Sequence, residues 1–287
     1  MRRLTAPDFT FFDTVTISVS GIASAVLRDK YGAQLPKTTA ETIENEFVSL
    51  ASAGTLHLLA RTPSNSLDIP ILGSLTKTEF IKLYTQYFSA KGKPGRKFYD
   101  LLKLTSDGKC PLCGGIGHVR TLDHYVPKAN FPLYSVMPGN LVPCCRDCNS
   151  EKLDSFPTTA GAQTLHPYFD NDKFFSERWL DARVLPVSPP VIEYFVSPPL
   201  SWSAAEVDRV SSHFASYDLA RRFSVEAGAD LTESIFMRRG VLSILSPQQF
   251  SEYLLEKGSN LSLPINNWRR IMFNCLARDN WFCSHSH

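Results

Sequence analysis

The stretch that decides the fold is the middle segment of the chain, which contains three informative runs: CPLC (110–113), TLDHYVPK (121–128) and GNLVPCCRDCNSEK (139–152). Two CxxC pairs lie at the ends of this segment, Cys110 with Cys113 and Cys145 with Cys148. A tight turn directs both thiolates of such a pair to one side, so two pairs can surround one tetrahedral ion. The spacing therefore predicts a closed zinc site whose metal stabilises a small, loop-rich unit.

The sequence also allows other arrangements of these thiols. The two pairs could be unrelated and buried separately, and Cys144 could replace Cys145, although only Cys145 keeps the two-residue spacing to Cys148. His118 is a weaker candidate ligand. Seven cysteines is an odd number, and metal binding by four of them argues against the disulfide framework of a small secreted domain. A reducing compartment is expected instead.

The residues between the two pairs suggest a small strand, loop, strand and helix. We predict a strand over Arg120–Val126 that ends at Pro127, a second short strand over Asn140–Pro143, and a helix over Cys145–Lys152. Consecutive residues of a strand point to opposite faces, so Asp123 and His124 can serve one site only if the strand is distorted or ends there.

This order of residues resembles the HNH endonucleases. Their ββα-metal finger carries an Asp-His pair at the end of the first strand, an Asn in the loop and a His or Asn on the helix, commonly braced by two CxxC knuckles. The matching residues here are Asp123, His124, Asn140 and Asn149. This chain has Asn149 where other members have His, and an amide oxygen favours Mg²⁺ over a softer transition metal.

The resemblance implies a metal-dependent endonuclease that hydrolyses phosphodiester bonds of DNA. His124 would be the general base, because an imidazole with a pKa of about 6.5 can accept a proton at neutral pH. Asp123 and Asn149 would hold a catalytic Mg²⁺ or Mn²⁺, and Asn140 would orient His124. The flanking phosphates would be held by three basic residues: Lys128, Arg146 and Lys152.

Each of these residues also has a structural explanation when taken singly. An isolated Asp-His pair usually makes a structural hydrogen bond, and an Asn that follows Gly139 usually forms a turn. Their joint occurrence beside the two CxxC pairs favours the nuclease. The alternative function is a zinc-stabilised module that binds nucleic acid or protein without catalysis, but a vestigial site would be expected to have lost Asp123, His124 or Asn149.

The composition of the 287-residue chain is that of a water-soluble globular protein, with 43% hydrophobic and 20% charged residues. The net charge is only +2, yet residues 91–152 contain ten Lys and Arg against five acidic residues. This local excess predicts a polyanionic partner, DNA under the nuclease hypothesis. The sequence contains no run of 18 apolar residues, so we predict no membrane span. The Ala23–Ala25 stretch resembles a signal-peptidase site, but Asp8 and Asp13 interrupt the preceding segment, so we predict a cytoplasmic protein.

We predict an α+β fold, predominantly helical, with the zinc-braced ββα unit between helical flanks. The expected regions are a helical one (1–105), the nuclease module (106–160) and a mostly helical one (161–287). Apolar periodicity predicts N-terminal helices over 39–52, capped by Thr38 and Glu41, over 76–89, and from Phe98 onward. It also predicts C-terminal helices over 206–222, 231–245, 247–256 and 268–277, with a strand over 191–196.

The helical flanks resemble, in layout only, the HNH effectors of bacterial antiphage defence systems of the Septu type. Those effectors act beside an ATPase partner. The resemblance implies that the flanks of this chain are docking surfaces that restrain the nuclease until it is triggered.

Overall fold

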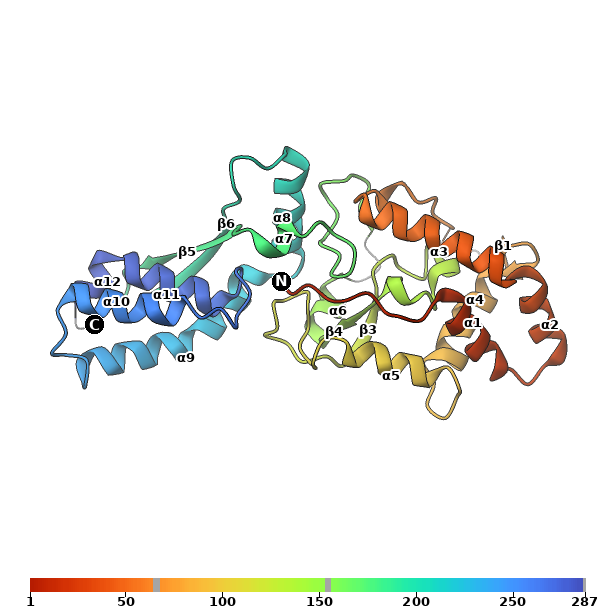
Figure 1. Cartoon of the computed structure of the whole chain (residues 1–287), viewed down its shortest axis with the longest axis horizontal. Coiled ribbons are helices and arrows are strands. Elements are labelled where there is room, and N and C mark those ends of the chain that lie inside the picture. Colours follow the sequence, from red (N-terminus) through yellow and green to blue (C-terminus); the bar gives the residue numbers. More distant parts are fainter. Residues whose placement is uncertain (64–67, 153–155, 286–287) are drawn as a thin grey trace.

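Helices dominate the computed structural model, which describes residues 1–63, 68–152 and 156–285. The described residues also form three antiparallel sheets of two strands each, so the prediction of a predominantly helical α+β fold is confirmed. In Figure 1 the first helices lie at one end of an elongated molecule, the last helices lie at the other, and the ββα unit lies between them.

The first hundred residues form a helical layer around one small hairpin. Its helices are α1 (Phe11–Ser20), α2 (Ala25–Gln34), α3 (Lys37–Ser52), η1 (Leu56–Leu58), α4 (Lys77–Lys82), the π-helical turn η2 (Leu83–Phe88) and α5 (Arg96–Leu104). The hairpin pairs β1 (Pro70–Leu72) with β2 (Leu75–Thr76). Fully buried side chains from separate helices form the core of this layer: Phe11, Phe47, Phe80, Phe88 and Leu102.

Local sequence explains where two of these helices begin. Thr10 and Asp13 form a capping box at the start of α1, and Thr76 and Glu79 form one at the start of α4, which satisfies the first backbone N–H groups of each helix. The predicted cap of α3 by Thr38 and Glu41 is wrong. Pro36 occupies the N-cap position and makes no side-chain bond, so Thr38 already lies inside the helix.

The ββα unit follows α5, as predicted, with slightly different bounds. Strand β3 (Thr121–His124) pairs antiparallel with β4 (Leu141–Cys144), and helix α6 (Arg146–Lys152) follows directly. The loop between the strands contains the short turns η3 (Pro132–Tyr134) and η4 (Pro138–Asn140). The first strand ends at His124, three residues before Pro127, because the chain turns there into this loop.

The C-terminal region is built on the hairpin β5 (Leu180–Leu185) and β6 (Val191–Val196), of which only β6 was predicted. Its helices are α7 (Lys173–Ser176), α8 (Ala204–Ser216), α9 (Leu219–Arg239), α10 (Pro247–Gly258), α11 (Trp268–Arg278) and α12 (Asn280–Ser284). The predicted helices over 247–256 and 268–277 are confirmed. Those over 206–222 and 231–245 have the wrong bounds, because the chain breaks at Asp218, which has a left-handed φ of 47°, and α9 runs without interruption to Arg239.

Two buried contacts hold the metal-binding segment and the ββα unit against residues that follow them, and a buried ion pair lies among those later residues. Tyr168 donates its hydroxyl hydrogen to the Leu141 carbonyl at 3.1 Å, and His213 Nε2 lies 2.8 Å from the Leu112 carbonyl. Arg209 and Asp170 form a buried ion pair at 2.7 Å beside these contacts.

Among the described residues, we find no helix that combines the length and the apolar character that crossing a membrane requires.

Candidate functional site

The four cysteines of the two CxxC pairs meet in one buried cluster, with their sulfur atoms all within 4.8 Å of one another. Cys110 and Cys113 belong to the turn after α5, whereas Cys145 precedes α6 and Cys148 lies in its first turn. The backbone supports this arrangement. The Gly117 N–H donates to the Cys113 sulfur at 3.3 Å, and a Cβ at residue 117 would lie 2.5 Å from the Cys145 sulfur, so this position requires glycine.

This cluster has the donor set and the size of a closed zinc site. Zn–S bonds of 2.3 Å in a tetrahedron place the sulfurs about 3.8 Å apart, and the sulfurs of Cys113 and Cys145 are 4.0 Å apart. Metal binds the thiolate form of cysteine, and hydrogen bonding from the Cys113 thiol lowers the pKa of Cys110. Cys144 lies outside the cluster and donates to the Cys145 carbonyl at 3.2 Å. The sulfurs therefore form one site and not two separate pairs.

The ββα unit places four of the predicted nuclease residues, Asp123, His124, Lys128 and Asn149, around a pocket that is separate from the sulfur cluster. This pocket has a volume of about 510 Å³ and is lined by Tyr84, Thr121, Leu122, Asp123, His124, Pro127, Lys128, Asn149 and Ser150. In the β3–β4 register, Asp123 lies opposite Val142 and His124 opposite Leu141. Both residues can line one pocket because the strand ends at His124, which is the condition that the sequence set for them.

His124 is held in one orientation by the loop that follows it. Its Nε2 atom lies 2.8 Å from the Ser135 carbonyl, and the Ser135 hydroxyl donates to the Phe80 carbonyl at 2.9 Å. A carbonyl can only accept, so Nε2 carries the hydrogen and Nδ1 carries the lone pair of the neutral ring. The Tyr84 ring packs edge-on against the imidazole at a centroid distance of 4.4 Å. Burial raises the pKa of Tyr84, so its phenol stays neutral beside His124.

Asn140 is fully buried and holds the same loop together. Its side-chain oxygen accepts from the Val126 N–H at 2.7 Å, and its amide donates to the carbonyls of Val126 and Tyr134 at 3.2 and 3.0 Å. Tyr134 directly precedes Ser135, whose carbonyl contacts His124. The geometry thus relates Asn140 to His124 through the loop backbone.

The oxygen donors of the pocket come from opposite sides of the unit. Asp123 is half-buried on β3, and Asn149 is exposed on α6, immediately after the cysteine ligand Cys148. A carboxylate and an amide oxygen are ligands that a hard divalent cation prefers. Lys128 completes the lining, with Nζ at 5.7 Å from the centre of the Tyr84 ring, a distance typical of a cation–π contact.

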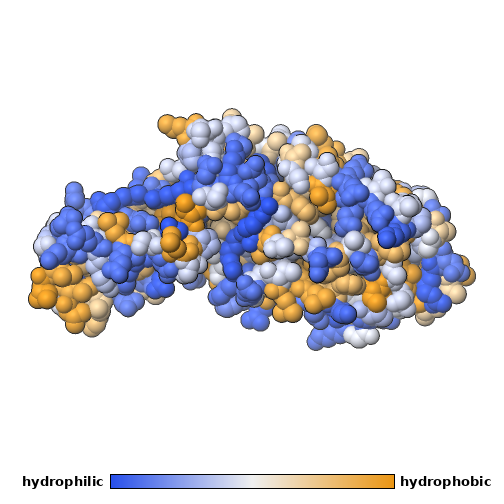
Figure 2. All heavy atoms as spheres, in the orientation of Figure 1, coloured by the Kyte–Doolittle hydropathy of each residue, from blue (hydrophilic) through white to orange (hydrophobic). Residues whose placement is uncertain are grey.

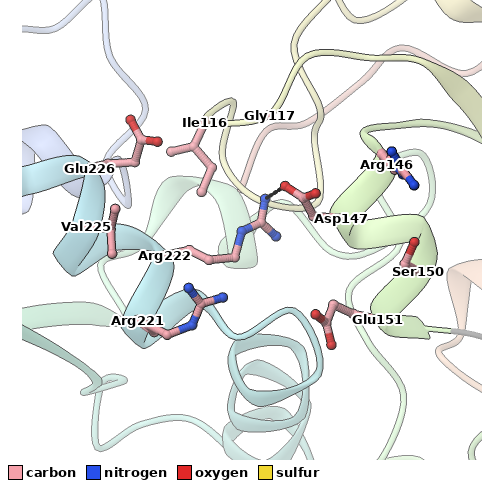
Figure 3. Close-up of a pocket in the computed structure, with 10 residues that line it drawn as sticks. All are labelled: Ile116, Gly117, Arg146, Asp147, Ser150, Glu151, Arg221, Arg222, Val225 and Glu226. Carbon is pink, nitrogen blue, oxygen red and sulfur yellow. Dashed lines mark hydrogen bonds and ion pairs between the residues drawn. The ribbon is translucent and has the colours of Figure 1, made fainter.

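Of the other predicted phosphate contacts, Arg146 lies elsewhere and the side chain of Lys152 is not described. Arg146 is exposed and lines a neighbouring pocket between α6 and α9 (Figure 3), not the pocket that contains His124. Lys152 ends α6, and its side chain lies outside the described residues.

Sequence reasoning missed the contribution of the N-terminal region to the pocket. Tyr84 belongs to the π-helical turn η2, a rare geometry that often occurs at functional sites. Behind it, the hydroxyl oxygens of Tyr99 and Thr121 lie 3.3 Å apart, which ties α5 to β3. No sequence signal marked Tyr84, because its apolar stripe is that of an ordinary core helix.

Comparison with known proteins places the chain without assigning an activity to it. No family model matches the sequence, the HNH models included, and no solved structure matches it. Protein ea31 of Escherichia phage lambda is 32% identical over an alignment of 294 residues, which covers 98% of this chain and 99% of the relative. The similarity extends over almost the full length of both proteins, so the chain belongs to the family of phage lambda protein ea31.

Proposed function

We propose that this protein is a metal-dependent endonuclease of the HNH type that hydrolyses phosphodiester bonds of DNA. One observation carries the proposal: Asp123, His124, Lys128 and Asn149 line a single pocket although they come from a strand, a loop and a helix. A zinc-stabilised binding module would not need an imidazole, a carboxylate, an amide and an ammonium group to meet in this way.

The tautomer of His124 defines its role in the reaction. Its Nε2–H donates to the Ser135 carbonyl, so Nδ1 accepts a proton from the attacking water. The water oxygen bonds to phosphorus, the bond to the 3′ oxygen breaks, and the leaving 3′ oxygen takes a proton from solvent. A general base that is held in position typically increases the rate of such a step by roughly 10²- to 10⁴-fold.

Asp123 and Asn149 would hold the catalytic cation, Mg²⁺ or Mn²⁺. When bound, such a cation supplies positive charge to the scissile phosphate and to the leaving oxygen. Lys128 would bind a neighbouring phosphate oxygen, because its ammonium group reaches the pocket over the Tyr84 ring. Phosphate contacts of this kind position a nucleic acid without reading its sequence.

We further propose that the nuclease is an effector in antiphage defence that acts with a partner ATPase. Besides the resemblance in layout, exposed apolar side chains near the end of α9 support a protein partner, since Phe236, Val241 and Ile244 are 73%, 69% and 88% exposed. Figure 2 shows hydrophobic atoms gathered at the end of the molecule where α9 ends in Figure 1.

Cleavage of plasmid DNA by the purified chain tests the nuclease proposal. With Mg²⁺ or Mn²⁺ the wild type should cut and with EDTA it should not. Asp123→Asn should lower the rate about 100-fold, because removing one group that stabilises charge at the reacting centre typically costs this much. Asp172→Asn is the matched control, since the Asp172 side chain is 85% exposed and lies outside the pocket.

The same assay distinguishes the alternative. A protein that binds DNA but leaves it intact with every metal, with the ATPase present as well as absent, is a binding module and not a nuclease. Equal rates for Asp123→Asn and Asp172→Asn would remove Asp123 from the active site.

A further inference from the structure

We infer that Arg222 of helix α9 is an outer-sphere ligand of the four-cysteine centre, through which the bound metal fastens the C-terminal helices to the ββα unit. Arg222 Nη1 donates to the Cys148 sulfur at 3.2 Å, and Nη2 donates to the Cys145 sulfur at 3.7 Å. The guanidinium thus spans two of the four cysteines from a helix more than 70 residues further along the chain.

Arg222 is buried and therefore needs a buried negative charge beside it, which the cysteine sulfurs provide. The residue is only 8% exposed, and a buried guanidinium is costly unless an anion faces it. Its other contacts are the Tyr217 carbonyl at 3.2 Å and Asp147 at 3.5 Å (Figure 3). The Asp147 side chain is 67% exposed, so solvent screens that ion pair. The two thiolates are therefore the buried negative charge that Arg222 faces.

A zinc ion with four thiolates carries a net charge of about −2, which explains why a cation belongs beside it. Hydrogen bonds to ligating atoms orient them and strengthen metal binding. Without the metal the sulfurs of Cys145 and Cys148 are no longer fixed by a shared ion, so the two acceptors that Arg222 contacts lose their fixed positions. The first turn of α9 should consequently loosen when zinc leaves.

Arg221 provides a matched comparison on the same helix. It is the preceding residue and carries the same charge, but its side chain is 66% exposed and pairs with Asp218. Figure 3 shows Arg221 and Arg222 at adjacent positions of α9, and its dashed line joins Arg222, not Arg221, to Asp147. A general effect of positive charge would appear in both residues, whereas coordination to the centre is specific to Arg222.

The experiment compares Arg222→Met with Arg221→Met, since methionine retains much of the side-chain length and removes the charge and the donors. Zinc transfer to a chromophoric chelator should be about 10- to 100-fold faster for Arg222→Met than for the wild type, and unchanged for Arg221→Met. Arg222→Lys keeps the charge but loses the two-pronged contact, so its rate should be intermediate. Equal transfer rates in all four proteins would overturn the inference.

Hydrogen exchange of the wild type gives a readout that does not depend on any variant folding. Stripping zinc should speed amide exchange in residues 217–226 while α10 and α11 remain protected. In Arg222→Met the exchange in 217–226 should be fast with zinc bound and should not respond to its removal. Exchange in 217–226 of the wild type that is the same with and without zinc would contradict the inference. Neither measurement requires nuclease activity, so the inference stands or fails apart from the proposed function.

Discussion

At the scale of single residues, two histidines differ in their hydrogen-bond partners and in their access to a pocket. His124 reaches a solvent-accessible pocket with the lone pair of its neutral ring on Nδ1. His213 is fully buried, accepts from the Leu165 N–H at 3.2 Å and donates to the Leu112 carbonyl at 2.8 Å. Burial lowers the pKa of His213 to about 3, so this ring is neutral in the folded protein and serves structure.

The lowered pKa of His213 predicts a loss of stability in mild acid. The unfolded chain protonates this residue at a pKa of 6.5 and the folded chain does not, so the free energy of unfolding falls as the pH drops below 6.5. Between pH 6.5 and pH 5 this group should cost about 2 kcal/mol. Urea unfolding at both pH values, at constant zinc, should show that His213→Gln loses less stability than the wild type by this amount. The same pH dependence in both proteins would be evidence against a neutral, buried His213.

Some residues of the two sites could be predicted from the sequence, and others could not. Asp123, His124 and Asn149 could be assigned to one site, because their order along the chain is characteristic and the strand ends where the chemistry requires. Ser135, Tyr84 and Arg222 could not, because each reaches its site through packing between distant segments. Arg146 was grouped with the phosphate contacts from its position in the motif, yet its place on α6 directs it to the neighbouring pocket.

At the scale of secondary-structure elements, the strand–strand–helix order of the ββα unit could be predicted and the break between α8 and α9 could not. Pro127, the CxxC spacing and the short apolar runs are local signals, and local signals decide β3, β4 and α6. The left-handed backbone of Asp218 has no such signal, because one aspartate in this conformation leaves no periodic pattern in the sequence. Strand β5 was not predicted either. It pairs with β6 across a proline-rich turn, and its own residues give no clear local signal.

Zinc should decide whether the ββα unit folds, because these short elements surround a cluster of sulfurs more than an apolar core of their own. Cys110→Ser should lose the metal, and the ββα unit should then unfold or promote aggregation, since binding of a structural zinc is itself a large part of the folding free energy of such units. Cys144→Ser is the matched control, because the hydroxyl can still donate to the Cys145 carbonyl and the cluster stays complete. Elemental analysis and thermal unfolding measure both effects.

Two outcomes of that comparison would contradict the assignment of the zinc ligands. Zinc content at the wild-type level in Cys110→Ser would exclude this thiol from the site. Loss of zinc from Cys144→Ser would instead mean that zinc binding requires Cys144 as well as the pair Cys145 and Cys148.

At the scale of the whole molecule, the sulfur cluster and the His124 pocket share helix α6 but use different residues of it. Cys148 faces the sulfur cluster and Asn149, the next residue, lines the pocket of His124. The N-terminal layer closes that pocket through Tyr84, and the C-terminal region contacts the sulfur cluster through Arg222. The sequence predicted helical flanks but not these contacts, because contacts between distant segments leave no periodic pattern.

The central claim is that the sulfur site maintains the fold while the His124 pocket performs the chemistry. Zinc content and Mg²⁺-dependent DNA cleavage, measured on one preparation of His124→Ala, test it most directly. We expect zinc at the wild-type level together with cleavage that is at least about 100-fold slower. Cleavage at the wild-type rate, or zinc lost together with the activity, would contradict it.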